Sequence, residues 1–442
     1  MTASQTVPFR VAVSYWWKLG LTSFGGPAGQ ISMLHDEVVF KRRWISDKRF
    51  LHALNYCMIL PGPEAQQLVT YIGWLMHGVR GGIVAGALFV LPSLILLITL
   101  SWLYIVWGDS TIVATMFETI KPVVIAVIAQ AVYRIGSRSL RHPLLWGIAI
   151  LSTALMLFSG SLFPAIVVGA ALIGFFGQRI FPQVFSVKVG HTSTEIAGEP
   201  AIIDDDTPTP AHAVIKKRRL LLTVIVSAAL WFLPVLILWV TVGPDNPLVH
   251  MALFFSGAAF LTFGGAYAVL PYVYNGAVTA GWATPSQMVD GLALGETTPG
   301  PLIMIVSFVG FIGGYVGELF GPGTSAVSGI VAAIVVTWFT FLPSFFFIIA
   351  GGPYVEATRG RVAFTAPLTA INAAVVGVVL SLAITFASHV LIPGGQSLNL
   401  LGATITLAAG AALFGFKRSI IEVVGAAALL GAVIGTASFL TA

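Results

Sequence analysis

Long runs of apolar residues recur along the chain and are separated by short polar connectors. Nine of these runs reach or approach the ~20 residues that a helix needs to cross the hydrocarbon core of a bilayer. They lie at about 81–107, 111–135, 143–159, 161–181, 219–241, 324–350, 362–387, 397–416 and 419–441. The pattern therefore predicts an all-α polytopic membrane protein.

Four further apolar stretches are interrupted near their middles by glycine pairs or by Pro-Gly-Pro; they are 10–40, 46–78, 248–280 and 286–316. Proline removes a backbone donor and glycine loosens a helix. In a membrane such breaks persist only where protein or water satisfies the freed backbone groups. We expect four re-entrant hairpins beside about nine full spans. The alternative is kinked full spans, which would give up to 13 membrane segments in all.

Short motifs occur twice in the same order, once in each half of the chain. The pairs are Phe24-Gly25-Gly26 with Phe263-Gly264-Gly265, Pro61-Gly62-Pro63 with Pro299-Gly300-Pro301, and Leu91-Pro92-Ser93 with Leu342-Pro343-Ser344. Phe24 precedes Pro61 by 37 residues, and Phe263 precedes Pro299 by 36. The next interval is longer in the second half, and we expect the extra residues around 321–323. The order and spacing indicate an internal duplication.

The duplication predicts the division of the chain. Residues 1–182 form the first repeat and 242–442 the second. The segment 183–218 is polar and contains prolines, so we expect a cytoplasmic linker, in the simplest case a plain tether. The span at 219–241 has no counterpart in the first half, and it would invert the second repeat relative to the first.

Charge supports this inversion. The connector 41–49 holds five basic residues, whereas its counterpart 275–286 holds none. The relation is reversed elsewhere, because the uncharged turn at 159–162 corresponds to a turn with Lys417 and Arg418. Basic loops favour the cytoplasm. We therefore expect two inverted-topology repeats, a common transporter architecture. The N-terminus would be cytoplasmic and the C-terminus periplasmic.

Composition narrows the function. The chain is 57% hydrophobic and only 9% charged, against about 25% charged in soluble domains. The net charge of +5 is modest and is carried largely by short connectors, so we expect no nucleic-acid partner. Cys57 is the single cysteine, and no Cys/His cluster, phosphate loop or catalytic triad motif is evident. We therefore expect no metal, no cofactor and no enzymatic activity.

The breaks themselves predict an anion site. Four half-helices would begin just after Gly26, Pro63, Gly265 and Pro301, and the N-terminus of a helix presents free N–H groups and a positive dipole end. The breaks could instead be packing kinks. The candidate substrate-binding residues are Phe24, Gly25, Gly26, Pro27, Pro61, Gly62, Pro63, Gln66, Gln67, Lys121, Phe263, Gly264, Gly265, Thr297, Thr298, Pro299, Gly300, Pro301 and Asn372.

Individual polar residues each carry two interpretations. Glu64 and Glu296 flank the Pro-Gly-Pro motifs and are candidates for proton coupling, because an intramembrane carboxylate is costly and functional by default. Glu64 could equally be a helix-dipole partner. Lys121 could attract an anion or extend its long side chain to the membrane interface. Asn372 could bind substrate or another helix.

At these residues the chain resembles the chromate ion transporter family. The likeness is carried by Phe24-Gly25-Gly26-Pro27 and Pro61-Gly62-Pro63-Glu64 with their second-half counterparts, and it covers both halves, as in the long-chain, two-domain form. The resemblance implies a bacterial inner-membrane carrier that expels chromate, confers chromate resistance and uses the proton motive force. The second half departs from the pattern, because Ala266 replaces proline and Glu296 precedes its motif.

Rival functions stay open at this level. Sulfate and other oxyanions share the shape and charge of chromate, so a sulfate carrier is one alternative. An anion channel is another, and a membrane enzyme or scaffold a third. A membrane potential with a negative cytoplasm drives an anion outward by roughly 2.3 kcal/mol per charge per 100 mV, so efflux needs no proton exchange. A homodimer in the lipid bilayer is also open.

Overall fold

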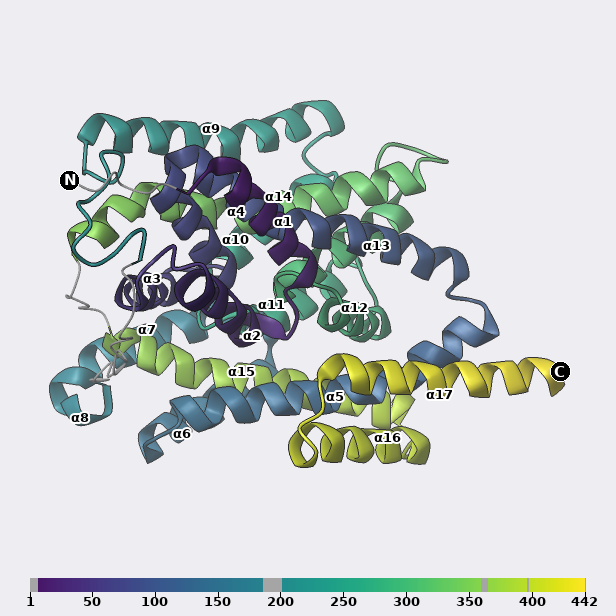
Figure 1. Ribbon diagram of the computed structural model, residues 1–442. Helices are drawn as coiled ribbons and strands as arrows, with labels where there is room; N and C mark the ends of the chain where they lie inside the picture. Colours follow the sequence, from purple (N-terminus) through teal and green to yellow (C-terminus); the bar gives the residue numbers. More distant parts are fainter. Residues whose placement is uncertain (1–6, 186–200, 359–364, 396, 442) are drawn as a thin grey trace.

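The computed structural model describes residues 7–185, 201–358, 365–395 and 397–441 as an assembly of helices (Figure 1). Among these residues the only strand-like pairing is an isolated bridge between Ile45 and Ile203. The α-helices are α1 (Phe9–Thr22), α2 (Gly26–His35), α3 (Asp47–Ile59), α4 (Glu64–Trp107), α5 (Thr111–Ser139), α6 (Pro143–Phe158), α7 (Phe163–Ile180), α8 (Pro182–Phe185), α9 (Lys217–Val242), α10 (Pro247–Phe260), α11 (Ala266–Thr279), α12 (Pro285–Thr297), α13 (Ile305–Gly317), α14 (Ser325–Ala357), α15 (Thr365–Leu391), α16 (Leu400–Gly410) and α17 (Ile420–Thr441).

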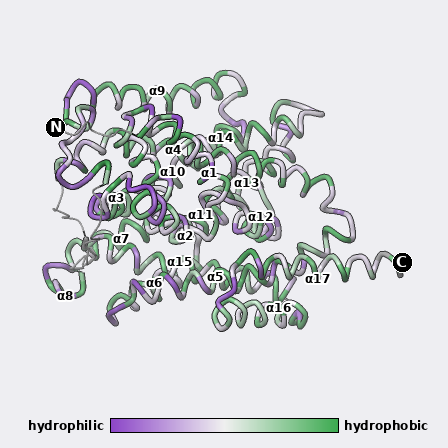
Figure 2. Tube along the Cα trace, viewed as in Figure 1, coloured by the Kyte–Doolittle hydropathy of each residue, from purple (hydrophilic) through white to green (hydrophobic). Residues whose placement is uncertain are grey.

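The prediction of an all-α polytopic membrane protein is confirmed. Seven helices in the described part of the chain are long and apolar enough to cross a membrane: Glu64–Trp107, Thr111–Ser139, Gly160–Ile180, Lys217–Val242, Ser325–Ala357, Ala366–Leu391 and Ile420–Ser438. Figure 2 shows hydrophobic residues along these helices, with hydrophilic residues gathered mainly at their connections.

Two of the nine expected spans are shorter than predicted. The stretch 143–159 forms α6, which has 16 residues, and 397–416 forms α16, which has 11 residues and continues into a five-residue π-helical turn. A helix rises 1.5 Å per residue, so α6 is about 24 Å long, less than the ~30 Å hydrocarbon core. Pro143 begins α6, and the extended backbone of Ser159 ends it.

The chain leaves helical geometry at each predicted break. The interruptions separate α1 from α2, α3 from α4, α10 from α11, and α12 from α13. Each contains a glycine with positive φ, for example 90° at Gly25, 126° at Gly62, 96° at Gly265 and 102° at Gly300. Side chains disfavour this backbone region. The segments are therefore pairs of short helices joined by non-helical glycine turns, rather than continuous kinked helices.

A helical hairpin follows the second break in each repeat. Within α4 the backbone reverses at His77 and Gly78, so that Gly73 packs against Ala85 and Gly82 lies against the Thr70 carbonyl. In the second repeat α13 packs against α14 in the same way. A loop at 318–324 replaces the tight turn there, at the place where the sequence predicted an insertion.

The two repeats interlock. Helix α5 of the first repeat packs against α15, α16 and α17 of the second, and α15 also packs against α6 and α7. Hydrogen bonds cross these contacts, as from the Thr119 hydroxyl to the Ala427 carbonyl (2.8 Å) and from Thr406 to Pro122 (3.0 Å). In Figure 1, α16 and α17 lie along one edge of the molecule and α9 along the opposite edge.

The linker departs from the simple tether that the sequence suggested. Residues 201–213 dock on the first repeat, where the N–H of Ile203 donates to the Trp44 carbonyl (3.0 Å) and the N–H of Ser46 donates to the Ile203 carbonyl (3.1 Å). The Ser46 hydroxyl also donates to Asp205 (2.7 Å). Ile203 packs against the buried cluster of α1, α3 and α4. The tether interpretation is therefore wrong for this part of the linker.

Candidate functional site

Two backbone hydrogen bonds join the breaks across the repeats. The N–H of Gly62, in the first Pro-Gly-Pro motif, donates to the Thr262 carbonyl at 2.7 Å. The N–H of Gly300, in the second Pro-Gly-Pro motif, donates to the Ser23 carbonyl at 2.9 Å. Thr262 and Ser23 each stand directly before a Phe-Gly-Gly motif. Each repeat thus binds the other through the same pair of motifs, and we call these two hydrogen bonds the peptide bridges.

The two peptide bridges lie close to one another. A Cβ built on Gly265 would lie 4.0 Å from the Cγ atom of Pro27, so the two Phe-Gly-Gly turns adjoin. Asn372 of α15 also lies here, because a Cβ on Gly264 would lie 2.8 Å from its side-chain oxygen. The four breaks, which are far apart in sequence, therefore gather in one region of the molecule.

The serines of the duplicated Leu-Pro-Ser motif contact the glycines of the peptide bridges. Gly62 lies against the Ser344 hydroxyl, and a Cβ on Gly300 would lie 2.7 Å from the Cβ of Ser93. Each serine thus backs the Pro-Gly-Pro turn of the opposite repeat. From the sequence, Ser93 and Ser344 served only as evidence of duplication. Their occurrence in both halves was the signal from which a role at the site could have been predicted.

Buried glutamines surround the bridges. The side-chain amide of Gln30 donates to the Gly300 carbonyl at 2.5 Å, and that of Gln67 donates to the Pro61 carbonyl at 2.7 Å. Gln66 instead donates to the Thr70 hydroxyl one turn further along α4 (3.0 Å). Gln30 was not among the predicted residues, although it follows Gly26 by four residues, as Gln67 follows Pro63; this shared offset was the signal that could have found it.

Several polar atoms around the bridges are buried and have no hydrogen-bond partner among the described residues. They are the side-chain oxygens of Ser23, Gln30, Gln66, Gln67 and Ser93. A buried polar group without a partner costs roughly 1–3 kcal/mol. Such a cluster indicates a region that receives water or a polar ligand. All five atoms belong to the first repeat, so the two repeats furnish its polar atoms unequally.

The two glutamates differ in their surroundings. Glu296, at the end of α12, accepts a hydrogen bond from the buried Tyr267 hydroxyl. Tyr267 lies two residues after Gly265, in the first turn of α11. Glu64 occupies the first turn of α4, and the described residues give its carboxylate no hydrogen bond or ion pair. Glu296 thus belongs to the bridged region through Tyr267, while Glu64 sits at the start of a half-helix.

Lys121 is engaged by carboxylates. Its Nζ atom lies 2.5 Å from Glu118 and 3.8 Å from Asp290, and only 12% of the Lys121 side chain is exposed. The Tyr104 hydroxyl donates to the same Asp290 (2.9 Å). Asp290 could not be recognised from the sequence, because its partners Lys121 and Tyr104 lie more than 160 residues away. These contacts favour a structural role for Lys121 over binding of the anion.

The remaining candidates are placed as follows. The hydroxyls of Thr297 and Thr298 donate back into their own helix, to the carbonyls of Ala293 (3.0 Å) and Gly295 (3.2 Å). Phe263 packs against the main buried cluster, and Phe24 is half-buried. Within the described ranges no group of three or more His, Cys, Asp and Glu residues could hold a metal ion.

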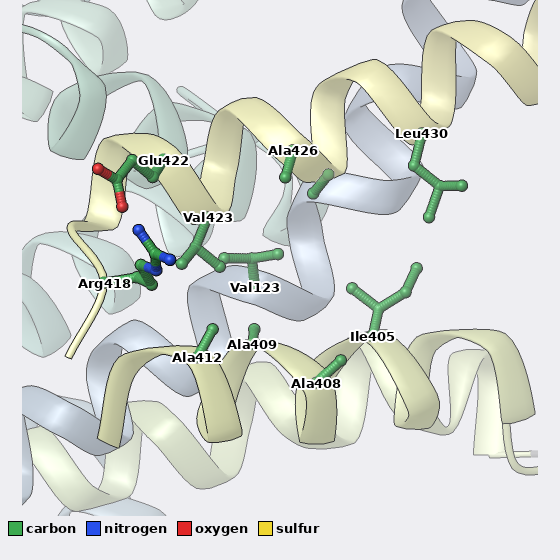
Figure 3. Close-up of a pocket in the computed structure, with 11 residues that line it drawn as sticks. Val123, Ile405, Ala408, Ala409, Ala412, Arg418, Glu422, Val423, Ala426 and Leu430 are labelled. Carbon is green, nitrogen blue, oxygen red and sulfur yellow. The ribbon is translucent and has the colours of Figure 1, made fainter. Parts of the chain in front are cut away.

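A separate cavity of about 490 Å³ lies away from the breaks, between α5, α16 and α17. Its walls are apolar, with Val123, Ile405 and Leu430 among them, and the charged Arg418 and Glu422 lie toward one end (Figure 3). No residue of the four breaks lines it. Its position and apolar walls give no reason to assign an oxyanion to it.

Helix breaks that meet within a bundle of apolar helices define the broken-helix class of membrane transporters. The chain belongs to the chromate transporter family, whose model matches residues 11–175 and 249–432. It is similar to a chromate transport protein of Pseudomonas aeruginosa, with 34% identity over 94% of this chain and 89% of that protein.

Two further relatives extend the comparison. A chromate transport protein of Cupriavidus metallidurans is 27% identical over 97% of this chain and 94% of its own length. The uncharacterized transporter YwrB of Bacillus subtilis is 31% identical over 30% of this chain and 68% of its own length. No solved structure matches this chain.

Proposed function

We propose that this protein is a secondary carrier that exports chromate from the cytoplasm and thereby confers chromate resistance. The family and the names of the full-length relatives support chromate as the substrate. The positive-inside pattern supports an N-terminus in the cytoplasm and a C-terminus in the periplasm of a bacterial inner membrane. The negative interior then drives a divalent anion outward.

The peptide bridges are the observation that carries the proposal. They bring together the N-terminal ends of α2, α4 and α11 and the start of the turn that leads into α13. Each helix start carries a partial positive charge and unpaired N–H groups. Together they supply positive potential and hydrogen-bond donors to a tetrahedral dianion. No full cationic charge is needed, so the anion is bound weakly enough to be released. Nearby, Ser23 and Ser93 have hydroxyl groups free to donate.

The arrangement also suggests how access alternates. In this conformation the N–H groups of Gly62 and Gly300 are both occupied, and both glycines are buried. An anion that binds these N–H groups must replace Thr262 or Ser23 as acceptor. We propose that one bridge opens toward the cytoplasm and the other toward the periplasm, so that the two related turns act as alternate gates.

Glu64 and Glu296 remain our candidates for proton coupling. A carboxylate next to a divalent anion repels it unless it is protonated. The hydrogen bond from Tyr267 holds Glu296 beside the bridges. Exchange of a proton for chromate would add the proton gradient to the electrical driving force, whereas purely electrogenic efflux would leave these carboxylates without a role in transport.

Chromate flux in proteoliposomes tests the proposal. Purified protein is reconstituted, and chromate movement is followed under imposed voltage and imposed pH gradients, with sulfate as competitor. We expect saturable flux that follows the voltage. Potent inhibition by sulfate with sulfate uptake would favour the general oxyanion carrier, and non-saturating flux would favour a channel. Absence of flux under every gradient would refute transport.

A further inference from the structure

A second cavity, of about 160 Å³, lies where the docked linker meets α4, α9 and α14. It has two kinds of lining. The basic side chains of His212, Lys216 and Arg219 belong to the linker and the start of α9, while Val79, Leu220 and Ile349 are apolar. No carboxylate lines the cavity. It is therefore an amphipathic, electropositive site at the end of an apolar helix.

The linker forms a defined wall of this cavity. Arg219 donates from its guanidinium to the Ala211 carbonyl at 3.2 Å, which ties the start of α9 to the linker. The His212 ring packs edge-on against Trp74 with ring centroids 5.3 Å apart, and Ala213 is only 2% exposed. These contacts make the wall a packed structure.

His212 provides an unused polar group at this wall. Its Nε2 atom is buried and has no hydrogen-bond partner in the described parts of the chain. Burial lowers the pKa of His212, and hydrogen bonding of the ring to the backbone of Trp74 and Leu75 opposes the shift. The ring thus adds a polar edge to this wall, and the charge at the cavity comes from Lys216 and Arg219.

The chemistry around the cavity matches one class of ligand. Lys216 and Arg219 belong to the run Lys216-Lys217-Arg218-Arg219, in which Lys216 is the N-cap of α9 and the other three residues form its first turn. No residue of α9 is buried, and Leu221 and Leu222 are each 60% exposed. Such an apolar helix faces lipid chains, and basic clusters or pockets beside transmembrane helices bind anionic headgroups.

We propose that this cavity binds the phosphate of an anionic phospholipid, with its acyl chains along α9 and α14. Lys216 and Arg219 supply the charge that holds the phosphate. Because Arg219 also donates to the Ala211 carbonyl, a bound lipid stabilises the contact between the linker and the start of α9. This site is separate from the peptide bridges and does not depend on which anion is transported.

Native mass spectrometry of the purified full-length chain tests the proposal, with phosphatidylglycerol and phosphatidylcholine as probes. The run of four basic residues offers a matched pair of variants. Lys216→Gln/Arg219→Gln removes two charges that line the cavity, and Lys217→Gln/Arg218→Gln removes two that do not. Both proteins are checked for monodispersity and an unchanged melting temperature without added lipid.

We expect the first variant to lose phosphatidylglycerol affinity by roughly 25-fold, because each of the two basic residues contributes about fivefold. The second variant should lose much less. Equal losses in the two double variants would overturn the cavity as the site. Equal binding of phosphatidylglycerol and phosphatidylcholine would also overturn the proposal. Displacement of the lipid by millimolar inorganic phosphate would show that the cavity is a site for free anions instead.

Discussion

The N–H of Gly62 donates a 2.7 Å hydrogen bond to the carbonyl of Thr262, 200 residues away in the second repeat. Its counterpart, from Gly300 to Ser23, repeats the contact with the roles of the repeats exchanged. A duplicated chain that binds itself by the same two motifs in both directions has an internal two-fold relationship at this point. A substrate site at this junction would be formed by both repeats.

Glycine at the centre of each Pro-Gly-Pro turn should be essential. Gly300→Ala places a side chain at φ 102° and within 2.7 Å of the Ser93 Cβ, so we expect a loss of about 1–3 kcal/mol in stability and loss of chromate flux. Thermal unfolding in detergent and proteoliposome flux measure the two effects. Gly147→Ala is the control, because a Cβ there meets nothing within 4 Å. Normal flux from Gly300→Ala would contradict the bridge as a functional element.

Glu296→Gln tests proton coupling with little change in shape. Glutamine still accepts the hydrogen bond from Tyr267 but cannot exchange a proton. If Glu296 carries the coupled proton, a pH gradient no longer accelerates chromate flux, while voltage still does. Glu64→Gln is tested in the same way, and the exposed Glu422→Gln serves as control. Full pH stimulation in both Glu296→Gln and Glu64→Gln would exclude these carboxylates from coupling.

Lys121 should stabilise the fold more than it binds substrate. Lys121→Met leaves the buried Asp290 without its cation, and breaking such a pair costs about 3 kcal/mol or more. We expect a lower melting temperature, an unchanged KM for chromate in the folded fraction, and partial recovery of stability in Lys121→Met/Asp290→Asn. A KM raised tenfold at unchanged stability would instead place Lys121 in the anion site.

Docking of the linker predicts its resistance to proteases. Ile203→Asp introduces a charge where Ile203 packs against the first repeat, so limited proteolysis within 201–213 should become several-fold faster. Val214→Asp is the matched control, because Val214 is 48% exposed. The docked arrangement would be wrong if wild type were cleaved as fast as Ile203→Asp.

The fold class and the breaks could be predicted from sequence because they depend on local composition. Apolar length predicts spans, and the glycine turns need no partner to be recognised. The extra loop at 318–324 could also be anticipated from motif spacing. Helix ends could be predicted less accurately, because α6 and α16 are both shorter than the apolar stretches that predicted them.

The contacts that define the site could not be predicted in this way. Ser93 faces Gly300, Gln30 binds the same glycine, and Asp290 pairs with Lys121, each across more than 160 residues of sequence. Single-sequence patterns carry no information on which distant segments meet. The duplication was the one exception, because it implied that any contact between unlike motifs would occur twice.

The most direct test of the central claim is equilibrium dialysis of chromate against Ser23→Ala/Ser93→Ala. Neither hydroxyl has a partner in the described fold, so alanine should leave stability intact and remove two donors from the bound anion. The control is Ser101→Ala, whose buried hydroxyl bonds only to its own helix. We predict a Kd raised at least tenfold in the double variant and unchanged in the control. An unchanged Kd in both would contradict an anion site at the joined breaks.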